Sequence, residues 1–250
     1  MTLTQDRLKE TLGNRPFRYF PQVNSTQDIA LAWLRDGGDA GAAVIADEQL
    51  AGRGRYQRTW YTPPGVALAV SVLLRPTAEM LPQITMLGAL VIAELADSLD
   101  APHVTIKWPN DVRVQGRKIS GVLPEAVWEG DHLVGVALGM GVNVRNDFQG
   151  TPLEATATSL EPALGVTLDR AVLVAELLRR VDYWLQRLGT PVLFDAWRAR
   201  LDTLGQMVTI NGITGTAENV EPDGALWVRD ANGHMHRVLA GDLMTSSEES

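Results

Sequence analysis

Four strand-like segments follow one another with only short turns between them, and this succession restricts the possible folds more than any other feature of the chain. The segments cover residues 104–108, 112–115, 118–127 and 133–138. The connections include the turns Gln115-Gly116-Arg117 and Glu129-Gly130-Asp131. Connections this short join antiparallel strands, because parallel neighbours need a crossover of about a dozen residues or more. The sequence therefore predicts an α+β fold rather than a doubly wound α/β sheet.

The remaining patterns predict a main domain over residues 1–203 and a smaller one after it. Apolar spacing and capping residues predict helices at 3–13, 26–35, 82–99, 168–188 and 191–201, and further strands at 17–20, 42–46 and 67–74. Short strands separated by turns such as Asn211-Gly212 and Asn232-Gly233 then predict a small β-barrel over residues 204–246. Residues 247–250 are polar and acidic, and we expect them to be disordered.

The composition excludes several classes of function. The chain has 250 residues and no cysteine, which removes disulfides, thiolate metal sites and cysteine nucleophiles. A net charge of -8 argues against a general attraction to nucleic acid or to an anionic membrane. The N-terminal residues lack the apolar core of a signal peptide, and one short helix there is too little for a helix-turn-helix module. We therefore expect a cytoplasmic protein that binds neither DNA nor membrane.

Residues 47–60, DEQLAGRGRYQRTW, combine arginine and glycine in a segment that we expect to form a loop between two strands. The residues that matter are Gly52, Arg53, Gly54, Arg55 and Arg58. Glycine lets a backbone approach a ligand closely, and guanidinium groups bind phosphate or carboxylate oxygens in pairs. The loop therefore predicts an anionic ligand, and its alternative is an exposed, solvated basic loop. Trp60 either packs in the core or stacks on a flat ring.

Three further segments are expected at strand ends or turns. Asn110 and Asp111 offer oxygen ligands that suit Mg²⁺ between phosphates, or they form an ordinary polar turn. Lys118 is either a solvated lysine or a group that holds a carboxylate and a phosphate together. The third segment is Gly139-Met140-Gly141, which does not complete a dinucleotide-binding motif because residue 144 is Val.

Taken in order, the segments GRGRYQRTW, KWPNDV, GRKISGVLPE and GMGVNV resemble the biotin protein ligases, also called biotin-[acetyl-CoA-carboxylase] ligases. The resemblance extends to NSTQD near the start and LAGDLM near the end, and so covers nearly the whole chain. It implies a mixed sheet with flanking helices, similar to class II aminoacyl-tRNA synthetases, followed by an SH3-like domain. It also implies that biotin attacks the α-phosphate of Mg-ATP to give biotinyl-5′-AMP and pyrophosphate. A lysine of a biotin carboxyl carrier protein, an acetyl-CoA carboxylase subunit, then displaces AMP.

The resemblance also implies roles for individual residues. Biotin would contact Ser25, Thr26, Gln27, Gln49, Arg53, Gly54, Arg55, Lys118, Gly121 and Leu123. ATP would contact Arg53, Arg55, Arg58, Trp60, Lys107, Asn110, Asp111, Lys118 and Asn143. The implied catalytic residues are Lys118, Arg53, Arg55 and Asp111, with Asn110 and Asp111 near the Mg²⁺ that ATP carries.

Two departures from the family pattern lead to further expectations. Tyr56 and Gln57 stand where some members have a second Arg-Gly pair, which removes one charge and one flexible position from the loop. An N-terminal DNA-binding domain is missing, so we expect a ligase without repressor activity; a homodimer is compatible with the resemblance. The alternatives are a lipoate-protein ligase, which uses the same adenylate chemistry, and a non-catalytic nucleotide- or RNA-binding module.

Overall fold

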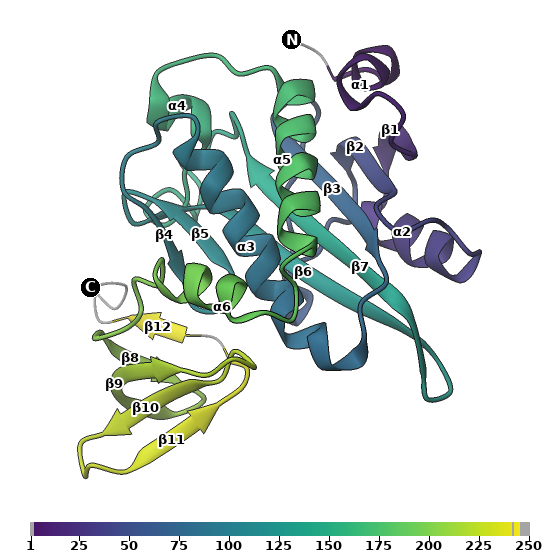
Figure 1. The fold of residues 1–250 in the computed structure, drawn as a ribbon. Coiled ribbons are helices and arrows are strands. Elements are labelled where there is room, and N and C mark those ends of the chain that lie inside the picture. Colours follow the sequence, from purple (N-terminus) through teal and green to yellow (C-terminus); the bar gives the residue numbers. More distant parts are fainter. Residues whose placement is uncertain (1–2, 242, 246–250) are drawn as a thin grey trace.

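The computed structural model describes residues 3–241 and 243–245, in which a large mixed sheet is followed by a smaller antiparallel one (Figure 1). The large sheet has the strand order β1-β2-β3-β7-β6-β5-β4. Its strands are β1 (Phe17–Val23), β2 (Ala43–Gln49), β3 (Ala67–Leu74), β4 (Val104–Lys107), β5 (Asp111–Val114), β6 (Arg117–Glu129) and β7 (His132–Asn143). β1 and β2 run parallel, and the other neighbouring strands of this sheet are antiparallel. The predicted α+β class is thereby confirmed.

Helices cover both faces of the large sheet. They are α1 (Gln5–Leu12), α2 (Thr26–Arg35), α3 (Leu81–Asp97), α4 (Leu160–Leu164), α5 (Arg170–Leu185) and α6 (Pro191–Arg198). Figure 1 shows α3 and α5 side by side across one face, and α2 lies on the other face against β2, β3 and β7. The stretch Ala78–Asp97 is long and apolar enough to cross a membrane by length and composition alone. It packs between the sheet and α5 and α6, which is the position of a core helix.

Large and small side chains alternate along β7, and this alternation creates space on one face of the sheet. The large residues, which belong to the core beneath α3 and α5, are Val136, Leu138, Met140 and Val142. The small residues, which point to the opposite face, are Ala137, Gly139 and Gly141. Because successive strand residues face opposite sides, large side chains cover one face of β7. The other face, which carries only small side chains here, is called the shallow face of the sheet.

Two predictions about this region are wrong. The strand predicted at 133–138 continues to Asn143, so Gly139-Met140-Gly141 lies inside β7 and not at a strand end. Glycine in a strand weakens local propensity, but here both edges of β7 are paired, with β3 and β6. Residues 47–49 belong to β2, so the predicted loop begins at residue 50 and contains one 3₁₀ turn, Arg55–Gln57. The other predicted helices and strands are found, with ends that differ by a few residues.

The second sheet has five antiparallel strands in the order β11-β10-β9-β8-β12. Its strands are β8 (Met207–Ile210), β9 (Ile213–Val220), β10 (Leu226–Asp230), β11 (Met235–Val238) and β12 (Leu243–Thr245). The turn between β8 and β9 is Asn211-Gly212, and both residues have positive φ, of 51° and 79°, as a two-residue hairpin turn requires. The division at residues 203 and 204 remains a prediction, and residues 247–250 lie outside the described residues.

Candidate active site

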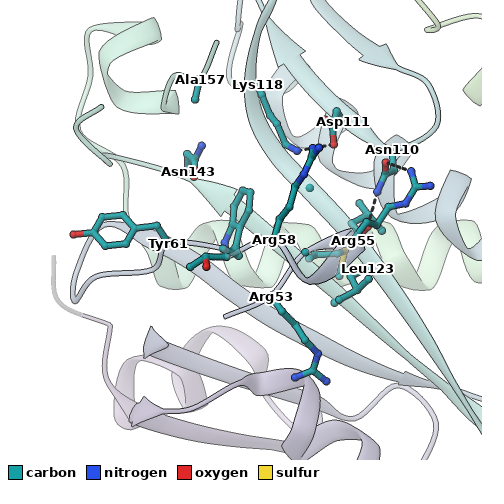
Figure 2. Close-up of a pocket in the computed structure, with 18 of the residues that line it drawn as sticks. Arg53, Arg55, Arg58, Tyr61, Asn110, Asp111, Lys118, Leu123, Asn143 and Ala157 are labelled. Atoms are coloured by element: carbon teal, nitrogen blue, oxygen red, sulfur yellow. Dashed lines mark hydrogen bonds and ion pairs between the residues drawn. The ribbon is translucent and has the colours of Figure 1, made fainter. Parts of the chain in front are cut away.

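A cavity of about 500 Å³ lies on the shallow face of the large sheet, beside α2 (Figure 2). Every residue that the sequence singled out for biotin or ATP lines it. They are Ser25, Thr26, Gln27, Gln49, Arg53, Gly54, Arg55, Arg58, Trp60, Lys107, Asn110, Asp111, Lys118, Gly121, Leu123 and Asn143. The chain therefore brings five separate segments of its sequence together at one site.

The floor of the cavity is formed by facing glycines of β6 and β7 with the indole of Trp60 packed on them. Gly121 and Gly141 are paired in register. An added Cβ at Gly141 would lie 2.4 Å from Trp60 Nε1, whereas one at Gly121 would lie 3.6 Å from Trp60 Cζ3. The indole therefore rests directly on the backbone of β7. Trp60 Nε1 is buried and has no hydrogen-bond partner among the described residues.

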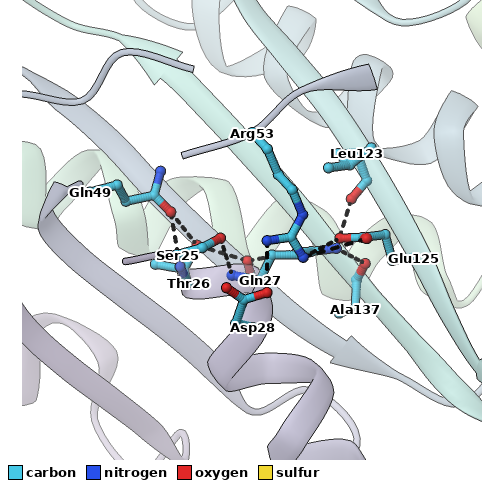
Figure 3. A network of polar contacts seen from close by, with 10 residues as sticks. Ser25, Thr26, Gln27, Asp28, Gln49, Arg53, Leu123, Glu125 and Ala137 are labelled. Atoms are coloured by element: carbon cyan, nitrogen blue, oxygen red, sulfur yellow. Dashed lines mark hydrogen bonds and ion pairs between the residues drawn. The ribbon is translucent and has the colours of Figure 1, made fainter. Parts of the chain in front are cut away.

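One end of the cavity is lined by uncharged polar groups that bond to one another (Figure 3). Ser71 Oγ lies 2.9 Å from Thr26 Oγ1 and donates to Gln27 Oε1 at 2.9 Å. Gln49 Oε1 accepts from the Thr26 backbone N–H at 2.9 Å and lies 3.1 Å from Thr26 Oγ1. Ser25 caps α2, where its hydroxyl accepts from the Gln27 backbone N–H. The network offers short donors and acceptors without net charge, which suits a neutral polar ring.

Gln27 has little capacity left for a ligand. Its Nε2 donates to Leu123 O at 3.1 Å and to Ala137 O at 2.9 Å, and its Oε1 accepts from Ser71. Both amide hydrogens are therefore used inside the protein. Gly139 makes this possible, since an added Cβ there would lie 2.7 Å from Gln27 Oε1. Gln27 thus serves to fix the polar network between α2 and the sheet.

Basic side chains gather at the other end of the cavity (Figure 2). Figure 2 shows Arg55, Arg58 and Lys118 there. Lys107 and Arg113 also line the cavity, and they pair in register with Asp111 and Lys118 of the neighbouring strands. Among the described lining residues Asp111 alone carries a carboxylate. Although the whole chain has a net charge of -8, this end of the cavity is formally positive and suits phosphate or carboxylate oxygens.

Direct contacts tie these groups to the strands. Lys118 Nζ lies 2.8 Å from Asp111 Oδ1, and both side chains are about one third exposed, at 36% and 30%. Arg55 Nη1 donates to Asn110 Oδ1 at 3.3 Å, and Asn110 Nδ2 donates to Val122 O at 2.6 Å. A partly exposed ion pair contributes about 0–1 kcal/mol, so an incoming anion can compete with Asp111 for Lys118 at small cost.

Arg53 differs from the other loop arginines in its surroundings. Its guanidinium turns toward Asp28 on α2 and Glu125 on β6, at 2.7 Å and 3.2 Å (Figure 3). Burial lowers the pKa of Arg53, but the contacts with the two carboxylates outweigh burial and raise its pKa above the ordinary value. The group therefore keeps its charge while part-buried.

Several lining residues escaped prediction. Ser71 is fully buried in β3, where it is the one polar residue of the run ALAVSVLL. A single serine in an otherwise apolar strand could have indicated a polar site, because a buried hydroxyl needs a hydrogen-bond partner. Tyr61 and Ala157 lie beside Asn143 in Figure 2, and Asn143 Nδ2 donates to Thr158 O at 3.1 Å. Near the C-terminus, Gly241, Leu243 and Met244 also line the cavity; they belong to the segment LAGDLM, to which the resemblance assigned no role in the site.

Comparison with known proteins agrees with this geometry. The model of the biotin/lipoate A/B protein ligase family matches residues 19–143. The biotin–[acetyl-CoA-carboxylase] ligase of Paracoccus denitrificans is 33% identical over 228 residues, which are 85% of this chain and 93% of that protein. The bifunctional ligase/repressor BirA of Bacillus spizizenii is 30% identical over 247 residues, 94% of this chain and 76% of that protein.

Solved structures give the same answer. The biotin protein ligase from Aquifex aeolicus, in complex with biotin and ATP, superposes with a TM-score of 0.78 and 27% identity. The match covers 92% of this chain and 98% of that one. The predicted resemblance to biotin protein ligases is therefore confirmed. The chain belongs to the biotin/lipoate A/B protein ligase family.

Proposed function

We propose that this chain is an ATP-dependent biotin protein ligase, which forms biotinyl-5′-AMP and transfers the biotinyl group to a lysine of a biotin carboxyl carrier protein. One observation carries the proposal. The cavity joins an uncharged polar end, built on Thr26, Ser71 and Gln49, to a basic end around Lys118. A neutral ureido ring fits the first end, and a carboxylate beside a triphosphate fits the second.

The first step joins the biotin carboxylate to the α-phosphorus of ATP and breaks the bond to the β-phosphate, so that pyrophosphate leaves. Negative charge accumulates on the phosphate oxygens as the new bond forms. Lys118 is the group that we assign to this charge, because it lies on β6 next to the floor of the cavity and its ammonium pairs with the partly exposed carboxylate of Asp111. Arg55 and Arg58 would bind the phosphates from the loop, and Lys107 from the end of β4.

Mg²⁺ is assigned to Asn110 and Asp111 together with ATP. The described residues contain no cluster of three or more metal-binding His, Cys, Asp or Glu side chains. That fits Mg²⁺, which commonly uses one or two protein carboxylates and takes its other ligands from phosphates and water. When bound there, the ion would neutralise charge on the phosphates.

The second step transfers the biotinyl group from AMP to the carrier lysine. The attacking amine must lose a proton, and Asp111 is the carboxylate that the described residues place in the cavity. We assign Asp111 to orienting or deprotonating this amine. Trp60 and Asn143, which both line the cavity, are assigned to the nucleotide, on which the indole ring would stack.

A lipoate-protein ligase is the alternative within the same family, and the cavity does not favour it. The lipoyl ring is apolar and cannot hydrogen-bond to the polar groups of Thr26, Ser71 and Gln49, whereas a ureido ring can. Competition between biotin and lipoate in adenylate formation separates the two functions.

The test of the proposal is biotin-dependent exchange of pyrophosphate into ATP. The wild-type chain should catalyse exchange with biotin and not with lipoate. Lys118→Ala should slow exchange by about 10²- to 10³-fold, the usual loss for one group that stabilises the transition state. Lys9→Ala, an exposed lysine of α1, is the matched control and should behave as wild type. Exchange with neither acid would overturn the proposal.

Three further assignments stay predictions of this proposal. The enzyme should not bind a biotin operator in a gel-shift assay, it should be cytoplasmic, and a homodimer is compatible with the family, so analytical ultracentrifugation would decide between monomer and homodimer. Specific operator binding would contradict the first of these.

A further inference from the structure

The loop that carries the arginines is a compact hairpin, which we call the 52–60 hairpin. Backbone hydrogen bonds run from Trp60 N to Gly52 O at 2.8 Å and from Gly54 N to Arg58 O at 2.8 Å. An isolated bridge also pairs Arg53 with Thr59. Residues 52–60 should therefore move as one unit, so a contact that holds one of them also holds Arg55 and Arg58 at the basic end of the cavity.

Arg53 fastens this hairpin to two other elements (Figure 3). Its Nη1 lies 2.7 Å from Asp28 Oδ1, in the first turn of α2. Its Nη2 donates to both oxygens of Glu125 on β6, at 3.2 Å and 3.5 Å. Neither Asp28 nor Glu125 is among the described residues that line the cavity. The two carboxylates thus act on the hairpin from outside the site, one from a helix and one from the sheet.

We propose that Asp28 and Glu125 are positioning residues, which hold the 52–60 hairpin across the cavity through Arg53. Two acidic partners on different elements fix both the position and the rotation of a planar guanidinium, which one partner cannot do. The hairpin then keeps Trp60 on the sheet and Arg55 beside Asn110. The kinetic consequence rests on the proposed function, whereas the structural consequence does not.

The structural test uses trypsin on the ligand-free, full-length chain. Cleavage after Arg55 and Arg58 reports how often the hairpin opens, because a protease needs a locally unfolded segment. Glu125→Gln should speed this cleavage about two- to fivefold, and Asp28→Asn with Glu125→Gln about three- to tenfold, as expected for partly exposed ion pairs. Glu129→Gln, at the exposed end of the same strand, is the matched control. Mass spectrometry identifies the cut, and thermal unfolding shows that each variant is folded.

The kinetic test uses biotin-dependent pyrophosphate exchange. Glu125→Gln should raise the KM for biotin about two- to tenfold and change kcat less than twofold, because a loosened hairpin weakens binding without removing a group from the reaction. In an Arg53→Ala background the same substitution should have no further effect, since Glu125 acts through Arg53.

Each result decides a separate question. Equal cleavage rates in Glu125→Gln, the double variant and Glu129→Gln would overturn the positioning role, even in an active enzyme. A lower KM in Glu125→Gln would also overturn it, because it would mean that the carboxylate competes with the substrate for Arg53. A wild-type chain without biotin-dependent exchange would overturn the proposed function and leave the proteolysis result standing.

Discussion

The substitution Gly141→Ala should damage the site while leaving the fold intact. Gly141 lies in the middle of β7, with its backbone paired to Ala69 on one side and Gly121 on the other. The strand cannot move away without breaking both pairings. An added Cβ would lie 2.4 Å from Trp60 Nε1, a separation that real Cβ atoms essentially never show. The indole of Trp60, which belongs to a loop, must therefore be the group that yields.

The size of the effect follows from this overlap. Ordinary contact begins at 3.4 Å, so the indole must shift by about 1 Å. Overpacking costs typically ~1–3 kcal/mol, and a loop can relax more readily than a core, so we expect a stability loss near ~1 kcal/mol. A displacement of about 1 Å at a reacting site can cost on the order of 10²-fold, so kcat/KM for biotin-dependent exchange should fall about 10- to 100-fold.

Gly121→Ala is a comparison variant that adds a methyl group to the same floor without the overlap. Its added Cβ would lie 3.6 Å from both Trp60 Cζ3 and Lys118 Nζ, which is ordinary contact, on the strand that pairs with β7. The assay is pyrophosphate exchange in parallel with urea unfolding of both variants. If Gly141→Ala retains activity within twofold of the wild-type chain, the position of Trp60 on the sheet does not matter and the reasoning fails.

Two predictions concern stability. Arg170 is 1% exposed and pairs with Asp47 Oδ1 at 2.6 Å, so Asp47→Ala should lower the free energy of unfolding by about 3 kcal/mol, because it leaves a buried charge unpaired. Glu10→Ala, which removes an exposed partner, should change it by less than ~1 kcal/mol in the same urea titration. The hydrogen bond from His236, more than any other contact, lowers the pKa of Asp230 from 3.8 to about 2. The stability that Asp230 contributes is therefore complete above pH 3.8 and lost as the pH falls to about 2, and Asp230→Asn should flatten this part of the acid unfolding profile.

The order of the helices and strands could be predicted because strand and helix periods are local properties of the sequence. The end of β7 could not be predicted, because Gly139 and Gly141 have low strand propensity and are held in the strand by β3 and β6. Those pairings join residues about 20 and 70 positions apart, which no local pattern reports. The alternation of large and small residues in Val136–Asn143 would have extended the strand correctly.

The site shows a similar division. Motifs located the basic groups, since Arg55 and Lys118 are recognisable from charge and glycine spacing. They did not show that Gln27 donates both amide hydrogens to backbone carbonyls. Those two hydrogen bonds join residues that are 96 and 110 positions apart in the sequence. They also did not show that Arg53 turns to Asp28 and Glu125. Partners of a polar side chain depend on tertiary packing, which the residue type alone does not determine.

The second sheet reaches the cavity, and this has a consequence for engineering. Trp108 Nε1 donates to Gly224 O at 2.9 Å, and Leu243 of β12 lies at the cavity rim. Residues of both the large sheet and the second sheet therefore line the cavity. A chimera that takes this sheet from a relative would therefore change residues that line the cavity, so the exchange should alter the site as well as the small domain.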